Sequence, residues 1–226
     1  FDDESLALTA RLLELNPEVY TIWNFRREAL ASKLDAGGPE AVSLAAQELS
    51  LSEKALSRNP KSYSAWHHRK WIVDKGLTSL EAELALVSKL LDVDERNFHA
   101  WGYRRFLVDL MGTPAERELS YAELKINQNF SNYSAWHYRT KLLPLVATGG
   151  KSSSIDDNSA GDKAADAKLE DLIHTSETSK AILLLLPKQV LDNEYELVKQ
   201  AFYTEPADQS AWFYHRWLLA QSQARF

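Results

Sequence analysis

The sequence of 226 residues contains no cysteine, which excludes a disulfide framework and any thiolate metal site. It also lacks a long apolar run. The longest one, Ile182 to Leu186, is too short to cross a bilayer and ends at Pro187. No signal peptide is visible, although the chain begins at Phe1 rather than at Met. We therefore expect a cytoplasmic protein without a membrane span.

Positive charge is scarce as well. The formal net charge is −6, and a general nucleic-acid binder needs a positive field to neutralise phosphates, so that class is disfavoured. Hydrophobic residues make up 45% and charged residues 26%, which is ordinary for a folded protein in water.

Five segments centred on a Trp repeat along the chain, at positions 23, 66, 101, 136 and 212. Successive gaps of 43, 35, 35 and 76 residues indicate a basic period near 35 with extra residues in the first and last gaps. This period is typical of one helix pair per repeat. The segments read NPEVYTIWNFRREAL, NPKSYSAWHHRKWIV, DERNFHAWGYRRFLV, NFSNYSAWHYRTKLL and EPADQSAWFYHRWLL.

Local signals agree with helices throughout. Each Trp segment opens with Asn, Asp or Glu, followed by Pro in three of them, which indicates a helix start. Between the Trp segments, apolar residues recur at helical spacing, and no segment alternates with period two. Examples are Leu80, Leu84, Val87 and Leu91. The predicted fold is all-α, an α-solenoid of stacked antiparallel helical hairpins.

The domain prediction is a single helical-repeat domain over residues 1–226 with five Trp-centred repeats. Residues 148–168 interrupt it and are rich in Gly, Ser, Asp, Ala and Lys. Because this composition cannot bury enough apolar surface to order itself, we expect a flexible low-complexity insertion there.

Helical geometry allows the repeats to be compared column by column. The aromatic residue three before the Trp in four repeats (Tyr20, Tyr63, Phe98, Tyr133) is expected to pack in the core, with the Trp itself. Three after the Trp stands an Arg in four repeats. This Arg is expected to pair with an acid in the adjacent repeat or to cap its helix carbonyls, and a catalytic role is the poorer alternative. The four are Arg26, Arg69, Arg104 and Arg139.

A second column lies five before, two before and two after each Trp, and it varies from repeat to repeat. Such variation on a regular scaffold predicts a surface that faces a partner or ligand. The partner-facing prediction covers Ser64, His68, Tyr103 and Tyr138.

Lys61 and Arg96 occupy equivalent positions of this column near helix N-termini, where backbone N–H groups favour anions such as a diphosphate. Two solvated cations explain the same pattern equally well. The six His show no metal-ligand spacing, so no metal site is expected in this chain. No motif indicates an active site that is complete within this chain.

The Trp segments resemble the repeat of protein prenyltransferase α subunits. Three stretches are similar to the type-II (Rab) geranylgeranyltransferase members in particular: DERNFHAWGYRRF from Asp94, NFSNYSAWHYR from Asn129 and DQSAWFYHRWLL from Asp208. The resemblance covers almost the whole chain apart from the insertion. It implies a right-handed superhelical crescent that scaffolds a β subunit in an obligate heterodimer.

The resemblance also implies an activity for the complex, although not for this subunit alone. The enzyme would transfer geranylgeranyl from its diphosphate to C-terminal Cys residues of Rab GTPases presented by the Rab escort protein. The β subunit would carry the zinc. The family's Lys that reaches the diphosphate corresponds to Lys61, with Tyr63 beside it and His99 lining the same opening.

Two alternatives stay open. The chain could be the α subunit shared by farnesyltransferase and type-I geranylgeranyltransferase, which would accept short CaaX peptides without an escort protein. It could also be a non-catalytic helical-repeat scaffold that binds peptides, in which case the second column contacts only protein.

Overall fold

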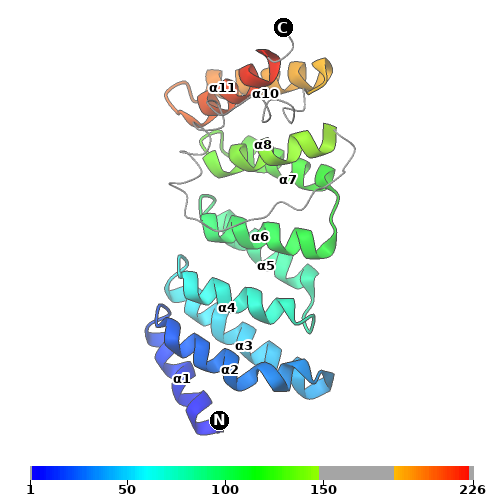
Figure 1. The fold of residues 1–226 in the computed structure, drawn as a ribbon. Coiled ribbons are helices and arrows are strands. Elements are labelled where there is room, and N and C mark those ends of the chain that lie inside the picture. The colour runs from blue at the N-terminus through cyan, green and yellow to red at the C-terminus, as the bar shows by residue number, and fades with distance from the viewer. Residues whose placement is uncertain (1, 148–185, 224–226) are drawn as a thin grey trace, which may run out of the picture. The chain divides into compact units, whose positions relative to one another are not determined.

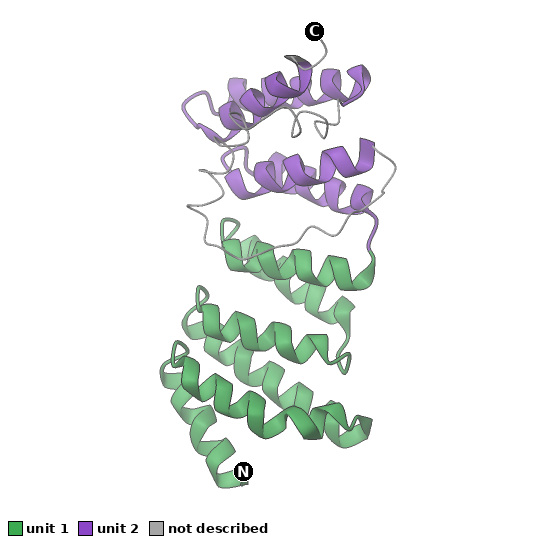
Figure 2. Cartoon of the chain, viewed as in Figure 1, with its two compact units in different colours: residues 1–112 green, residues 113–226 purple. Residues whose placement is uncertain are grey.

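The computed structural model describes residues 2–147 and 186–223, and in this part of the chain all regular structure is helical (Figure 1). The chain forms two compact units, residues 1–112 and 113–226 (Figure 2). Unit 1 contains α1 (Asp3–Leu15), α2 (Tyr20–Asp35), α3 (Gly38–Arg58), α4 (Tyr63–Asp74), α5 (Leu80–Val93) and α6 (Phe98–Met111). Unit 2 contains α7 (Ala115–Gln128), α8 (Tyr133–Ala147), α10 (Lys188–Thr204) and α11 (Ser210–Gln223).

Capping residues explain where several of the helices begin or end. Asp2, Ser62, Ser79 and Asn97 accept a hydrogen bond from a backbone N–H in the first turn of α1, α4, α5 and α6. Gly112 ends α6 in the left-handed conformation with φ of 58°, which glycine adopts without steric cost. Local sequence therefore explains these five helix ends.

Consecutive helices pair into hairpins, and each Trp-bearing helix follows a short loop. The Trp indole fastens this loop, because its Nε1 donates to the carbonyl oxygen six residues earlier in every repeat. The distances are 2.8 Å for Trp23, Trp66, Trp101 and Trp136, and 3.4 Å for Trp212. The repeated Trp thus serves both packing and loop geometry.

The core of each unit is built from these Trp rings and the aliphatic residues around them. Trp23, Trp101 and Trp136 are buried almost completely, and Leu30, Val73, Val108 and Leu143 are buried seven residues after their Trp. Trp212 is half-exposed in the last repeat. The small residue before the Trp, Ala65, Ala100 or Ala135, is fully buried and lets helices approach closely.

The all-α prediction of stacked helical hairpins is confirmed. The insertion predicted at residues 148–168 lies outside the described residues. Since the two units are described separately, a single domain stays a prediction. None of the helices in the described ranges has the length and apolarity needed to span a membrane.

Candidate functional site

Lys61 and Arg96 lie in equivalent loops, each just before a Trp-bearing helix, and each loop has the same turn. The backbone N–H of Lys61 donates to Asn59 Oδ1 at 3.1 Å, and that of Arg96 donates to Asp94 Oδ1 at 3.3 Å. Such Asx turns hold the backbone of the residue two positions on. Both side chains are exposed. The sequence therefore presents two cations from loops of matched conformation.

Neighbouring loops in unit 1 are also hydrogen-bonded to each other. The Ser62 hydroxyl donates to the carbonyl oxygen of Pro17 at 3.2 Å, and Asn97 Nδ2 donates to the carbonyl oxygen of Pro60 at 3.1 Å. Each of these carbonyls also accepts the Trp indole N–H of its own repeat. Because the N-cap residue of one repeat bonds the loop before it, the loops of Lys61 and Arg96 are held side by side.

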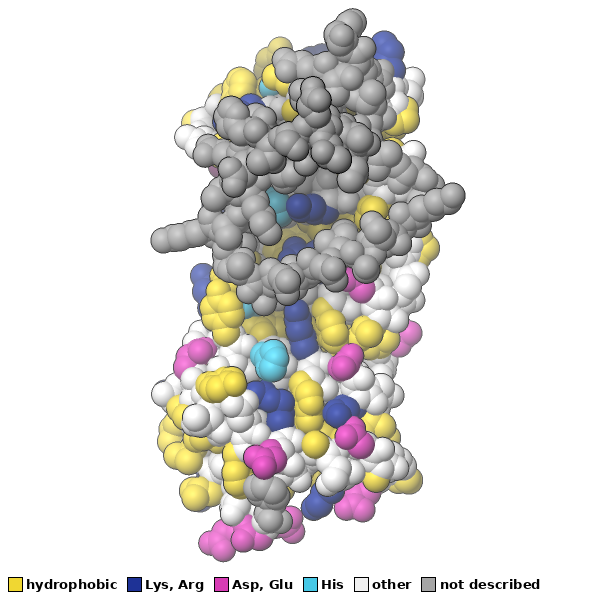
Figure 3. Space-filling model, viewed as in Figure 1, with side chains coloured by type: hydrophobic (Ala, Val, Ile, Leu, Met, Phe, Trp, Pro, Cys, Tyr) yellow, Lys and Arg dark blue, Asp and Glu magenta, His cyan; other side chains and the backbone are white. Residues whose placement is uncertain are grey.

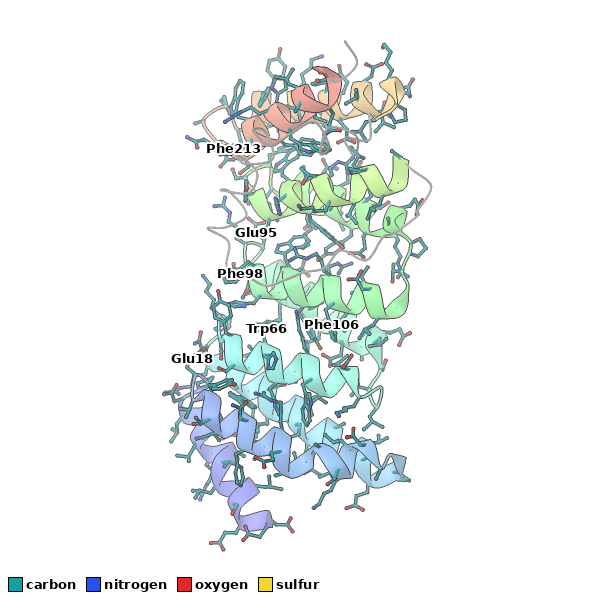
Figure 4. The ribbon with its side chains drawn as sticks, in the orientation of Figure 1. Glu18, Trp66, Glu95, Phe98, Phe106 and Phe213 are labelled. Atoms are coloured by element: carbon teal, nitrogen blue, oxygen red, sulfur yellow. The ribbon has the colours of Figure 1, made fainter. Side chains whose placement is uncertain are left out.

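Exposed aromatic residues border these loops. Tyr63 is 62% exposed, and its ring centroid lies 4.2 Å from that of His99 in an edge-on arrangement and 5.9 Å from that of Phe98. Figure 4 labels Phe98 at the start of α6 and Glu95 in the loop before it. The structure therefore brings Tyr63 and His99 together beside the loops of Lys61 and Arg96.

The expectation that the aromatic column three before the Trp packs in the core is wrong. Tyr20, Tyr63, Phe98 and Tyr133 are 58%, 62%, 39% and 40% exposed. Each is the first residue of its helix. Helical side chains tilt toward the N-terminus, so a side chain on the first residue projects past the helix end. Tyr63 is thereby available to a ligand.

The partner-facing prediction is wrong for His68, Tyr103 and Tyr138, which are almost completely buried. Each makes a hydrogen bond to a buried glutamate twenty residues earlier: His68 Nε2 to Glu48 at 3.0 Å, the Tyr103 hydroxyl to Glu83, and the Tyr138 hydroxyl to Glu118 at 3.2 Å. His68 and Tyr103 also pack on the Trp of the preceding repeat, with centroids 4.5 and 5.1 Å apart. Only Ser64 stays partly exposed, so its partner-facing role stays a prediction.

Glutamates at this position of the repeat also accept hydrogen bonds from the repeated Arg of the preceding repeat. Arg69 Nε and Nη2 donate to the two carboxylate oxygens of Glu83 at 2.7 Å each, and Arg139 makes the same paired contact with Glu194 at 2.7 and 2.6 Å. Arg26 pairs with both carboxylate oxygens of Glu48. The predicted pairing with an acid in the adjacent repeat is confirmed for these three Arg.

Arg69 and Arg26 also donate to backbone carbonyls of the helix before their own, those of Leu49 and Leu6. We call each set of Arg, Glu and His or Tyr an inter-repeat relay: Arg26–Glu48–His68, Arg69–Glu83–Tyr103 and Arg139–Glu194–Tyr214.

Electrostatics in the relays follow from burial and pairing. Burial, reinforced by the negative charge of Glu83, raises the pKa of Tyr103, so its hydroxyl remains a donor. Burial lowers the pKa of His68 despite its bond to Glu48. Burial alone would raise the pKa of Glu48, but hydrogen bonds from His68 and Arg26 lower it overall. These groups are buried, and their hydrogen bonds join neighbouring repeats.

The relay glutamates recur at a fixed distance before the Trp, outside the columns within seven residues of the Trp that were compared above. A Glu precedes the Trp by eighteen residues in four of the five repeats, as Glu48, Glu83, Glu118 and Glu194. The first repeat has Ser5 at this position, and the last has His215 in place of the Arg. A longer comparison window would therefore have predicted the pairing partner.

The geometry limits the chemistry available to this chain. Within residues 2–147 and 186–223, no three His, Asp or Glu side chains gather as a metal site. The surface at these loops carries two cations, Lys61 and Arg96, beside two polar aromatic groups, Tyr63 and His99. This combination suits the binding of an anion that is presented from outside.

The family model for the protein prenyltransferase alpha subunit repeat matches five segments of the sequence, residues 2–32, 45–76, 80–111, 115–145 and 191–222. The chain belongs to the protein prenyltransferase alpha subunit family. The five matched segments contain the five Trp residues and the relay residues of every repeat.

Curated proteins similar to this chain are named as alpha subunits of type-2 geranylgeranyl transferases. The geranylgeranyl transferase type-2 subunit alpha 1 of Arabidopsis thaliana is 46% identical over 225 residues, covering 98% of this chain and 29% of the relative. The type-2 subunit alpha of Rattus norvegicus is 63% identical over 38 residues, covering 17% of this chain and 7% of the relative. The chain therefore spans less than a third of the length of these curated relatives.

A solved structure shares the fold of this prenyltransferase alpha subunit family member. The Candida albicans protein geranylgeranyltransferase-I complexed with GGPP matches with a TM-score of 0.64 at 22% identity, covering 99% of this chain and 61% of that one.

Proposed function

We propose that the chain is the alpha subunit of a heterodimeric type-2 (Rab) geranylgeranyltransferase, which transfers geranylgeranyl from its diphosphate to C-terminal Cys residues of Rab GTPases. The observation that carries this proposal is the 46% identity to the Arabidopsis type-2 alpha subunit over 98% of the chain. The proposed partners are a β subunit, in an obligate heterodimer, and the Rab escort protein with its bound Rab. The proposed location is the cytoplasm.

In this proposal, Lys61 and Arg96 stabilise the leaving diphosphate. Negative charge develops on the diphosphate oxygens as the bond to C1 of the isoprenoid breaks, and a fixed cation placed near these oxygens lowers the barrier. The Asx turns and the loop-to-loop hydrogen bonds support this role, because they hold the backbone at both cations before any ligand binds. Tyr63 and His99 would line the opening beside them.

The remaining chemistry would come from the partner. Zinc held by the β subunit would lower the pKa of the acceptor thiol. This chain's own residues would bind and orient the diphosphate and scaffold the β subunit. Ser64, which is partly exposed on α4, is proposed to face the partner.

The experiment that tests this proposal co-expresses the chain with the type-2 β subunit of the same organism and compares Lys61→Ala with Lys89→Ala. Lys89 is also an exposed lysine of unit 1, but it lies on α5 rather than in the loops. Lys61→Ala should slow geranylgeranyl transfer about 10-fold or more while the heterodimer still assembles. Lys89→Ala should change neither.

Three results would contradict parts of this proposal. Loss of the complex in Lys61→Ala would make Lys61 an interface residue and contradict its catalytic role. A complex that modifies short CaaX peptides without an escort protein would favour the farnesyltransferase and type-I family members. Failure of the unaltered chain to bind any β subunit would favour a peptide-binding scaffold.

A further inference from the structure

A buried asparagine joins the two cation-bearing loops of unit 1. Asn97 directly follows Arg96 in the sequence and is only 3% exposed. Its Nδ2 donates to the carbonyl oxygen of Pro60 at 3.1 Å, and Pro60 directly precedes Lys61. We call this hydrogen bond the loop bridge. Asn97 is therefore next to one cation in the sequence and bonded to the residue before the other.

The other end of the same amide fixes the start of α6. Asn97 Oδ1 accepts the backbone N–H groups of His99 at 3.1 Å and of Ala100 at 3.2 Å. The backbone of Asn97 is held as well, since its N–H donates to the carbonyl oxygen of Asp94 at 3.1 Å and its carbonyl oxygen accepts the N–H of Trp101 at 3.1 Å. A buried polar group with its donor and acceptor both paired is rigid. The loop before α4 is thereby tied to a rigid helix start.

The side chains next to this buried amide lie at the surface. Lys61, Tyr63 and Arg96 are exposed, and Figure 3 shows basic and hydrophobic side chains next to each other at the left edge of unit 1, near the start of α6. Long exposed side chains lose rotamer freedom when they bind a ligand, and a mobile backbone beneath them would add to this cost. A backbone that is already fixed reduces it.

An equivalent hydrogen bond in unit 1 shows which side chains can make such a contact. Ser62 occupies the position equivalent to Asn97, four residues before the Trp of its repeat. The Ser62 hydroxyl caps α4 by accepting the N–H of Ala65 at 3.2 Å, and it also donates to the carbonyl oxygen of Pro17 at 3.2 Å. An ionised Asp can cap a helix but has no donor for a loop bridge. Ser is therefore expected to replace Asn97 in both contacts, whereas Asp keeps the cap and loses the loop bridge.

We propose that Asn97 is a positioning residue for the transfer reaction that acts through Lys61, because the loop bridge holds the Lys61 loop in place beside the start of α6. This inference rests on the proposed function. Stabilisation of a leaving group depends on cations that are in place before the charge develops, so a loosened Lys61 loop should slow the transfer step. The affinity for geranylgeranyl diphosphate should change little, because an interaction realised mainly in the transition state contributes little to binding of the substrate.

The test measures the single-turnover rate of geranylgeranyl transfer by the complex of this chain with its type-2 β subunit, together with the Kd for geranylgeranyl diphosphate. The variants are Asn97→Asp, Asn97→Gly and Asn97→Ser, each also made in the Lys61→Ala background. Asn97→Gly removes the loop bridge without adding a charge, and Gly is tolerated at helix N-caps, so it decides the matter if Asp disturbs folding. Ser79→Ala removes the N-cap of α5 in the same unit and controls for a loss of stability. Circular dichroism melting and size-exclusion chromatography verify folding and assembly of each variant.

The proposal predicts that Asn97→Asp and Asn97→Gly each lower the single-turnover rate at least about 5-fold, while the Kd for geranylgeranyl diphosphate changes less than about threefold. Asn97→Ser and Ser79→Ala should stay within about twofold of the unaltered complex. In the Lys61→Ala background, Asn97→Gly should lower the rate by less than about a further twofold, because a residue that acts through Lys61 has little effect once Lys61 is removed.

Two results overturn this inference and leave the proposed function intact. One is an assembled Asn97→Gly complex that transfers as fast as the unaltered complex while Lys61→Ala is slow. The other is a loss of rate on Asn97→Gly that is equally large in the Lys61→Ala background, which would show that Asn97 does not act through Lys61. If the unaltered complex transfers no geranylgeranyl at all, the proposed function fails as well.

Discussion

The relays predict an unusually large stability effect from one substitution, Arg69→Met. The Arg69 side chain is 2% exposed and that of Glu83 is 7% exposed, and two hydrogen bonds of 2.7 Å join them. Removing Arg69 leaves the Glu83 carboxylate buried, with the Tyr103 hydroxyl as a remaining donor. Breaking a buried pair from one side costs about 3–5 kcal/mol, because the surviving charge stays desolvated.

The matched control is Lys54→Met. Lys54 Nζ lies 3.0 Å from Glu14 Oε1, but the two side chains are 63% and 41% exposed, so solvent already screens the pair. Its loss should cost less than about 1 kcal/mol. The two substitutions therefore remove the same kind of ion pair and differ mainly in burial.

The assay is equilibrium urea unfolding followed by circular dichroism, comparing the free energies of unfolding of the unaltered chain and the two variants. A loss of about 3–5 kcal/mol is a large share of the 5–15 kcal/mol that typically separates folded from unfolded domains. The reasoning is refuted if Arg69→Met destabilises the chain no more than Lys54→Met. Replacing Glu83 by Leu and Tyr103 by Phe in the Arg69→Met background should recover part of the loss, because no buried charge then remains.

Three further predictions concern single residues. Burial lowers the pKa of His68 in the folded state below 6.5. The contribution of His68 to stability is therefore fully present above pH 6.5 and is lost as the pH falls below that value. His68→Tyr should flatten this loss in unfolding midpoints measured from pH 5 to 8. Trp101→Phe should cost about 1 kcal/mol by removing the indole bond to the Glu95 carbonyl, measurable by urea unfolding; an unchanged midpoint would contradict this. Tyr63→Ala should raise the KM for geranylgeranyl diphosphate and change the free energy of unfolding by less than about 0.5 kcal/mol, because the side chain is 62% exposed; a large loss of stability would contradict its availability to a ligand.

The fold could be predicted from the sequence because its signals are local and repeated. The Asx and Pro helix starts and the apolar stripes each act within one or two helical turns, and the Trp spacing near 35 residues shows that they recur once per repeat. Together these signals identified the hairpins. The Arg column could be assigned to pairing because an Arg that recurs once per repeat suits a structural role shared by all repeats.

Burial within the columns could not be predicted from residue type. Tyr63 and Tyr103 are the same residue type, yet Tyr63 is exposed because it begins a helix. Tyr103 is buried, because its hydroxyl donates to Glu83 and its ring packs on Trp66. The relay contacts span between 14 and 55 residues, well beyond the window of helical periodicity. The matched loops of Lys61 and Arg96 likewise depend on hydrogen bonds between repeats.

The most direct test of the central claim is geranylgeranyl transfer by the complex of this chain with its type-2 β subunit. The acceptors are a Rab GTPase, assayed with and without its escort protein, and a short CaaX peptide. The account predicts transfer to the Rab only when the escort protein is present and little transfer to the peptide. Transfer to the peptide alone, independent of an escort protein, would contradict it.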